Sequence, residues 1–113
     1  MLDAKVETSA YFAALSEVSL ESVCSAIQSR YSLPQFVIDD HDTWSYGVSW
    51  NNQLHINITK AQDTSTIETW MPDCPEGVNF QVVVESDDEP PELISTLRSA
   101  LEAEPVAYAS RHE

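Results

Sequence analysis

The strongest constraint on the fold is a strict alternation of apolar and polar residues in the middle of the chain. The alternation runs through residues 43–50 and resumes over residues 54–60, after a short polar interruption. Successive side chains of a β-strand point to opposite faces, so this pattern predicts two half-buried strands. The short interruption predicts that the two strands form an antiparallel hairpin.

The register of this hairpin follows from matching its apolar residues. A three-residue loop sets Trp50 opposite Leu54 and Val48 opposite Ile56, with Asn52 or Gln53 in the left-handed conformation. A slip of one residue would move every side chain to the other face, so we favour this register over a two-residue Asn51-Asn52 turn, which would set Trp50 opposite Gln53. It predicts one apolar face, which the helices are expected to cover, and one polar face. The apolar face is formed by Trp44, Tyr46, Val48, Trp50, Leu54, Ile56 and Ile58, and the polar face by Ser45, Gly47, Ser49, His55, Asn57 and Thr59.

Helical periodicity appears on both sides of this hairpin. Residues 19–30 form an apolar stripe after a suitable N-cap, Ser19, and a second stripe covers residues 90–103. A shorter helical segment is predicted over residues 11–18. Further strands are predicted at residues 35–39, 66–71, 78–85 and 106–109.

These elements predict a single α+β domain spanning residues 1–113. We expect a two-layer sandwich, in which an antiparallel sheet of four to six strands carries the 19–30 and 90–103 helices on one face. Residues 1–8 are predicted to form a loose arm, and residues 110–113 a frayed tail.

The charge balance restricts the partners of this domain. Nineteen Asp and Glu residues face only five Lys and Arg residues, which gives a formal net charge of -14 on 113 residues. Such a chain repels nucleic acid and anionic membranes and attracts basic proteins.

The acidic N-terminal residues do not resemble a signal peptide, and no stretch reaches the ~20 apolar residues of a membrane span. We therefore expect a cytoplasmic protein.

No motif predicts a cofactor, a metal site or a catalytic centre. Cys24 and Cys74 lack the spacing of a zinc site or a disulfide framework, and the acids around Cys74 are expected to raise the pKa of its thiol. Residues 39–42 (Asp-Asp-His-Asp) offer ligands for a divalent ion. However, four consecutive residues do not converge on one ion without a specialised loop, so a solvated turn is favoured. An enzyme is the less favoured class.

Candidate partner-binding residues are the acids and one aromatic residue. On a strand over residues 66–71, Glu68 and Trp70 share one face, where Trp70 either anchors a partner or caps the core. The acidic run over residues 85–92 suits the first turn of a helix and also projects negative charge outward. The full set is Asp39, Asp40, Asp42, Glu68, Trp70, Glu85, Asp87, Asp88 and Glu89.

Three functional hypotheses follow. The first is a protein-binding module, in particular an immunity or antitoxin-like inhibitor whose carboxylates cover the cationic cleft of a nuclease-type toxin. The second is an escort protein, because the chain is similar to type III secretion chaperones in size, acidity and mix of elements, a similarity that implies a homodimer. The third is a small-ligand binder or enzyme that uses the polar hairpin face, with Ser49, His55 and Asn57 as its first candidates.

Overall fold

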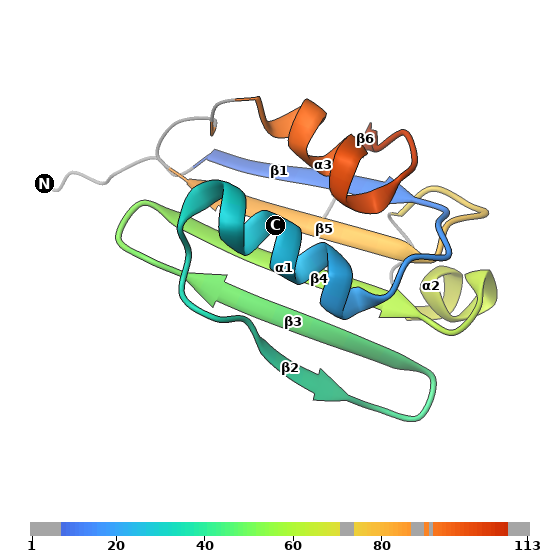
Figure 1. Ribbon diagram of the computed structural model, residues 1–113. Coiled ribbons are helices and arrows are strands. Elements are labelled where there is room, and N and C mark those ends of the chain that lie inside the picture. The colour runs from blue at the N-terminus through green and yellow to red at the C-terminus, as the bar shows by residue number, and fades with distance from the viewer. Residues whose placement is uncertain (1–7, 71–73, 87–89, 91, 109–113) are drawn as a thin grey trace, which may run out of the picture.

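A computed structural model describes residues 8–70, 74–86, 90 and 92–108 (Figure 1). Six strands form one sheet in the order β2-β3-β4-β5-β1-β6, and every neighbouring pair is antiparallel. The strands are β1 (Thr8–Ala14), β2 (Val37–Asp40), β3 (Trp44–Trp50), β4 (Leu54–Ala61), β5 (Phe80–Ser86) and β6 (Val106–Tyr108). The helices are α1 (Leu20–Tyr31), α2 (Thr64–Trp70) and α3 (Leu93–Leu101).

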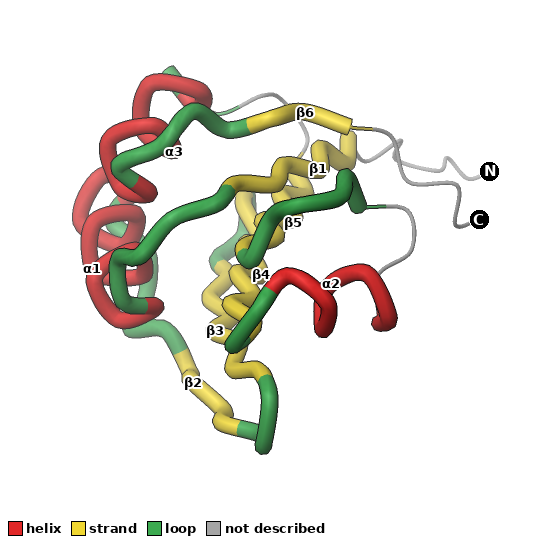
Figure 2. The backbone as a smooth tube through the Cα atoms, turned by 90° about the vertical axis from the view of Figure 1, so that its right-hand side faces the viewer, coloured by secondary structure: helices red, strands yellow, loops and turns green. Residues whose placement is uncertain are grey.

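Two helices cover one face of this sheet. Figure 2 shows α1 and α3 together on one side of the strands and α2 on the other. The main core fills the space between the sheet and the helix pair, and its largest fully buried side chains include Phe80, Ile27, Ile56, Ile58, Leu93, Leu97 and Leu101. The predicted α+β fold, with an antiparallel sheet and two main helices on one face, is therefore confirmed.

The first of these helices follows the sequence signals closely. The Ser19 hydroxyl accepts a hydrogen bond from the Ser22 N–H, as expected of an N-cap. Leu20, Val23 and Ile27 lie on the buried stripe. Ser32 ends the helix in the left-handed conformation.

Helix α3 begins later than predicted. Glu92 stands at its N-cap with a φ of 55°, and no acidic residue lies in the first turn. The 85–92 run therefore precedes the helix instead of forming its first turn. The loose arm at residues 1–7 and the frayed tail at 110–113 lie outside the described residues, whereas Thr8 belongs to β1.

The prediction of a helical segment over residues 11–18 is wrong. This part of the chain forms β1, which lies between β5 and β6, with Phe12 opposite Val82 and Tyr11 opposite Val83. Because β1 is covered on both faces over part of its length, Ala13 and Ala14 are both buried. The resulting continuous apolar run hides the two-residue period of the strand.

The prediction of a strand over residues 66–71 is also wrong. The Asp63 carboxylate accepts hydrogen bonds from the Thr66 N–H at 3.0 Å and from the Ser65 hydroxyl at 2.9 Å. These bonds stabilise the start of α2 and lower the pKa of Asp63, the Thr66 N–H having the largest effect. The β-branched residues of this segment favour a strand, and the capping interaction together with burial of Ile67 outweighs that preference.

The hairpin has a different register from the predicted one. Trp50 lies opposite His55, and Val48 lies opposite Asn57. The Asn51 side-chain oxygen accepts hydrogen bonds from the N–H groups of Gln53 and Leu54, which fixes a loop of Asn52 and Gln53 that differs from both turns considered from the sequence. Asn52 and Gln53 both have negative φ, contrary to the expectation of a left-handed residue.

The observed register places small residues of β3, not its aromatic residues, beneath α1. Gly47 and Ser49 are buried on the helix-covered face, opposite Ile58 and Ile56. A Cβ atom on Gly47 would lie 2.9 Å from the Cys24 Sγ atom of α1. The close approach of this helix excludes a large side chain at the centre of β3.

Replacing Gly47 with alanine tests this contact. We expect Gly47→Ala to lower the free energy of unfolding by about 1–3 kcal/mol, because the added methyl group displaces either Cys24 or the β3 backbone. Urea unfolding measures the change.

The double variant Gly47→Ala/Cys24→Ala identifies the atoms responsible. We expect its loss of stability to be smaller than the sum of the two single losses by about 1 kcal/mol, since the sulfur atom is gone. Strict additivity would show that Cys24 does not cause the clash.

Candidate functional site

The face of the sheet opposite α1 and α3 gathers aromatic and polar side chains. Only its end near Ala13 and Ala61 is covered within the described residues, by α2 and the loop at residues 74–78. We call the uncovered part the open face. It contains a hollow of about 620 Å³, lined by His41, Trp44, Tyr46, His55, Asn57, Thr59, Gln81, Val83 and Glu85.

The register of three strands builds this surface. Tyr46, Thr59 and Gln81 lie side by side across β3, β4 and β5. A parallel row places Trp50 beside His55 and His55 beside Glu85. Because the strands pair without interruption here, the hollow has a hydrogen-bonded floor.

Three rings form a stack along one side of the hollow. The His41 ring lies 4.2 Å from the Trp44 ring, measured between centroids, with an angle of 16° between their planes. The Tyr46 ring lies 5.4 Å from Trp44 at 23° and 5.9 Å from His41 at 10°. The nearly parallel rings present flat apolar surface beside polar groups.

Two carboxylates lie on the open face, Asp39 in the row of Tyr46 and Glu85 in the row of Trp50 and His55. The Asp39 carboxylate lies 3.6 Å from the His41 Nε2 atom and 3.4 Å from the Tyr46 hydroxyl. The Glu85 carboxylate lies 3.6 Å from the His55 Nδ1 atom. The side chains of Asp39 and Glu85 keep 55% and 41% of their surface exposed, so both remain accessible to a partner.

The basic residues that the structure describes lie elsewhere. Arg30 pairs with Glu92 at 3.3 Å, and Arg98 pairs with Glu104 at 2.7 Å. Lys60 points to the helix-covered side, where its Nζ atom donates a hydrogen bond to the Val18 carbonyl at 2.7 Å. Among the described residues, the carboxylates of the open face therefore have no Lys or Arg counterion.

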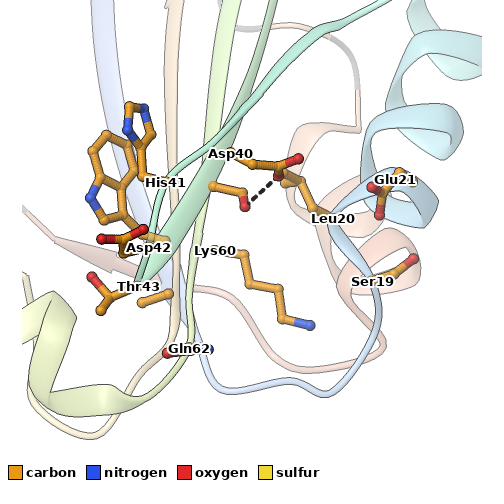
Figure 3. A pocket seen from close by; sticks show the side chains of 12 residues that line it. Ser19, Leu20, Glu21, Asp40, His41, Asp42, Thr43, Lys60 and Gln62 are labelled. Carbon is orange, nitrogen blue, oxygen red and sulfur yellow. Dashed lines mark hydrogen bonds between the residues drawn. The ribbon is translucent and has the colours of Figure 1, made fainter.

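A second, smaller hollow lies on the helix-covered side of the same sheet edge. It measures about 260 Å³, and Figure 3 shows Lys60 extending into it from β4 toward the start of α1. Asp40, Asp42 and Glu21 line it, and the Asp40 carboxylate accepts a hydrogen bond from the Ser45 hydroxyl at 2.7 Å. No group of three possible metal ligands occurs in the described part of the chain.

The structure separates the residues of the predicted acidic turn. Asp39 reaches the open face, whereas Asp40 and Asp42 line the smaller hollow. His41 and Trp44 line both hollows, since they stand at the sheet edge between them. The first part of the cluster belongs to the edge strand β2, with Asp39 and Asp40 paired to Tyr46 and Ser45.

The other predicted partner-binding residues have different outcomes. Glu85 lies on the open face. Glu68 and Trp70 belong to helix α2, so the strand on which they were predicted to share a face is wrong. Asp87, Asp88 and Glu89 lie outside the described residues.

The predicted polar hairpin face is divided between the two sides of the sheet. His55 and Asn57 line the hollow of the open face. Ser49 lies on the opposite side, where it is 2% exposed and its hydroxyl donates a hydrogen bond to the Pro34 carbonyl at 2.6 Å. A serine and histidine pairing on this face is therefore ruled out by the register.

Sequence reasoning missed the aromatic residues of the open face. Trp44, Tyr46 and Trp50 were expected in the core, yet Trp50 is 54% exposed. The signal that could have placed them is the alternating set of small residues Ser45, Gly47 and Ser49, which suits the close approach of a helix. Apolarity alone assigned the larger side chains to the core.

Both cysteines are free and buried. Burial raises the pKa of the Cys24 thiol to about 12, and the charge of Glu21 adds a smaller effect. The pKa of the Cys74 thiol is raised as well, with burial as the largest cause, and Asp73, one of the neighbouring acids expected to raise it, lies outside the described residues. A hydrogen bond with Tyr108 partly opposes that shift.

Comparisons of this chain with protein-family models, curated proteins and solved structures gave no match. In the described part of the chain, no helix has the length and apolar character needed to cross a membrane.

Thiol reactivity tests the burial of the two cysteines. At pH 8 we expect iodoacetamide to alkylate Cys24 of the folded protein at less than about one hundredth of the rate of free cysteine, because its raised pKa leaves little thiolate, and to alkylate Cys74 more slowly than free cysteine. Mass spectrometry follows the modification, and in denaturing urea both thiols should react at the ordinary rate. Rapid alkylation without urea would contradict the buried positions.

Proposed function

We propose that this protein binds a basic protein partner through the open face. The observation that carries the proposal is a face on which the exposed ring of Trp50 and the half-buried rings of Trp44 and Tyr46 lie together. The same face carries the carboxylates of Asp39 and Glu85, with no described basic side chain to neutralise them. Aromatic residues are the preferred anchors of protein interfaces, and they contribute most where they are desolvated in a complex. The carboxylates add complementarity to a cationic surface.

The more specific form of the proposal is an inhibitor of the immunity or antitoxin type that acts in the cytoplasm. A net charge of -14 accelerates association with a cationic, nuclease-type protein and suppresses binding to acidic proteins. Carboxylates at the open face would then occupy the cleft that otherwise holds phosphate groups. The inhibitor would act by covering this cleft and needs no chemistry of its own.

The hollow also favours a second candidate function, the binding of a small polar ligand. His55 lies beside Glu85, and the Nδ1 atom of His55 is buried without a hydrogen-bond partner within the described residues. Asn57 and Gln81 add amide groups to the same hollow. This surface has the mixture of rings and polar groups common in ligand sites.

The escort hypothesis stays a prediction, and a strictly monomeric mass in solution would remove it.

Capture from the native lysate tests the protein-binding function. We expect the tagged protein to retain a basic protein in stoichiometric amount at about 50 mM salt and to lose most of it at about 500 mM, because screening weakens charge attraction. Mass spectrometry identifies the retained protein. Retention that does not respond to salt would contradict a charge-driven interface.

Two substitutions locate the contact surface. Trp50→Ser and Tyr46→Ala should each reduce the retained partner at least about fivefold, as expected for aromatic anchors of an interface. Leu15→Ser is the matched control, since Leu15 is a large apolar residue, 62% exposed and outside the open face. Equal retention by all three variants would place the interface elsewhere.

A further inference from the structure

We infer that the hollow of the open face binds an arginine side chain of the basic partner. This inference rests on the proposed function and specifies the group that is recognised. It is carried by the nearly parallel rings of His41, Trp44 and Tyr46 and by the Asp39 carboxylate, which contacts two of them.

The rings provide a stacking surface for a planar cation. Their planes differ by 10–23°, so a flat group lying against one ring is nearly parallel to all three. A guanidinium group is planar and weakly hydrated, and it stacks on aromatic faces through both dispersion and charge. The ammonium group of lysine has no flat surface with which to extend this stack.

The carboxylates provide acceptors at two separate places. The Asp39 carboxylate stands next to the Tyr46 hydroxyl and the His41 imidazole, at one side of the rings. The Glu85 carboxylate stands two strands away from Tyr46, beside His55. The two carboxylates lie three strands and four residues apart, so one guanidinium group cannot reach both. Asp39 would accept N–H groups of the arginine that stacks on the rings, and Glu85 stays available to a neighbouring arginine of the same partner.

The chain itself does not supply this cation within the described residues. Arg30 and Arg98 are held by Glu92 and Glu104, and Lys60 is held by the Val18 carbonyl on the other side of the sheet. The carboxylates of the open face contact imidazole and hydroxyl groups instead. An arginine of the partner would therefore bring a positive charge to a face on which Asp39 and Glu85 have no Lys or Arg counterion among the described residues.

Peptide titrations test the preference for arginine. Hexa-arginine and hexa-lysine carry the same side-chain charge and differ in the group that they present. At about 150 mM salt we expect hexa-arginine to bind at least about fivefold more tightly, because only guanidinium stacks on the rings while it donates to the Asp39 carboxylate. Two-dimensional NMR measures the affinity and should show the largest shifts at the Trp44 indole N–H and at the β3, β4 and β5 amides.

Charge-neutralising variants distinguish binding at the open face from non-specific attraction of the peptide to the acidic surface. Asp39→Asn and Glu85→Gln should each weaken hexa-arginine binding about threefold to tenfold. Glu21→Gln is the matched control, since it removes one exposed carboxylate from α1 on the helix-covered side and should change binding by less than about twofold. Tyr46→Phe, which keeps the ring, should retain the preference for arginine, whereas Tyr46→Ala should reduce it.

Two results would overturn the inference. One is equal affinity for the two peptides, with shifts spread over the acidic surface. The other is an effect of Asp39→Asn and Glu85→Gln no larger than that of Glu21→Gln. Neither result would affect the conclusion of the capture experiment. A partner whose retention depends on Trp50 would still support protein binding by the open face. Loss of both the arginine preference and the Trp50-dependent capture would instead reject the proposed function.

Discussion

The close packing of α1 against β3 determines how the two faces of this protein differ. With the Cys24 sulfur lying where a Cβ atom of residue 47 would need space, β3 tolerates only a small residue beneath the helix. The alternating partners of those small residues, Trp44, Tyr46 and Trp50, must then point to the opposite side. Protein interiors are densely packed and adjust little, so this contact assigns the aromatic rings to the open face.

The same arrangement explains how one sheet combines a buried core on one face with an accessible surface on the other. The main core draws on Leu, Ile, Val and Phe side chains from the helices and from the inner face of the sheet. A separate cluster around Ile67 and Cys74 anchors α2 over one end of the opposite face. The rest of that face carries aromatic rings, amides and carboxylates on the paired strands β3, β4 and β5. Rigid strands hold such groups in a fixed geometry better than loops do.

Acidity has two roles in this molecule. Over long distances the net charge favours encounters with basic partners. At short range only a few carboxylates are placed where a partner could use them, and the structure distinguishes Asp39 and Glu85 from acids that serve local purposes. Asp63 stabilises the start of α2, and Glu92 and Glu104 pair with arginines. Composition alone does not separate these roles.

The sequence by itself determined the fold class, the strands of the hairpin and helix α1 with its N-cap, because these depend on short-range periodicity and local hydrogen bonds. Tertiary structure decided what depends on distant partners. It made residues 8–14 a strand by inserting them between β5 and β6. It also exposed the aromatic side of β3, since α1 packs on the side that carries Gly47. The candidate site exists because α1 covers this face of β3 and leaves the aromatic face open. The alternating pattern predicts that a strand has two different faces, but it does not say which face a helix will cover.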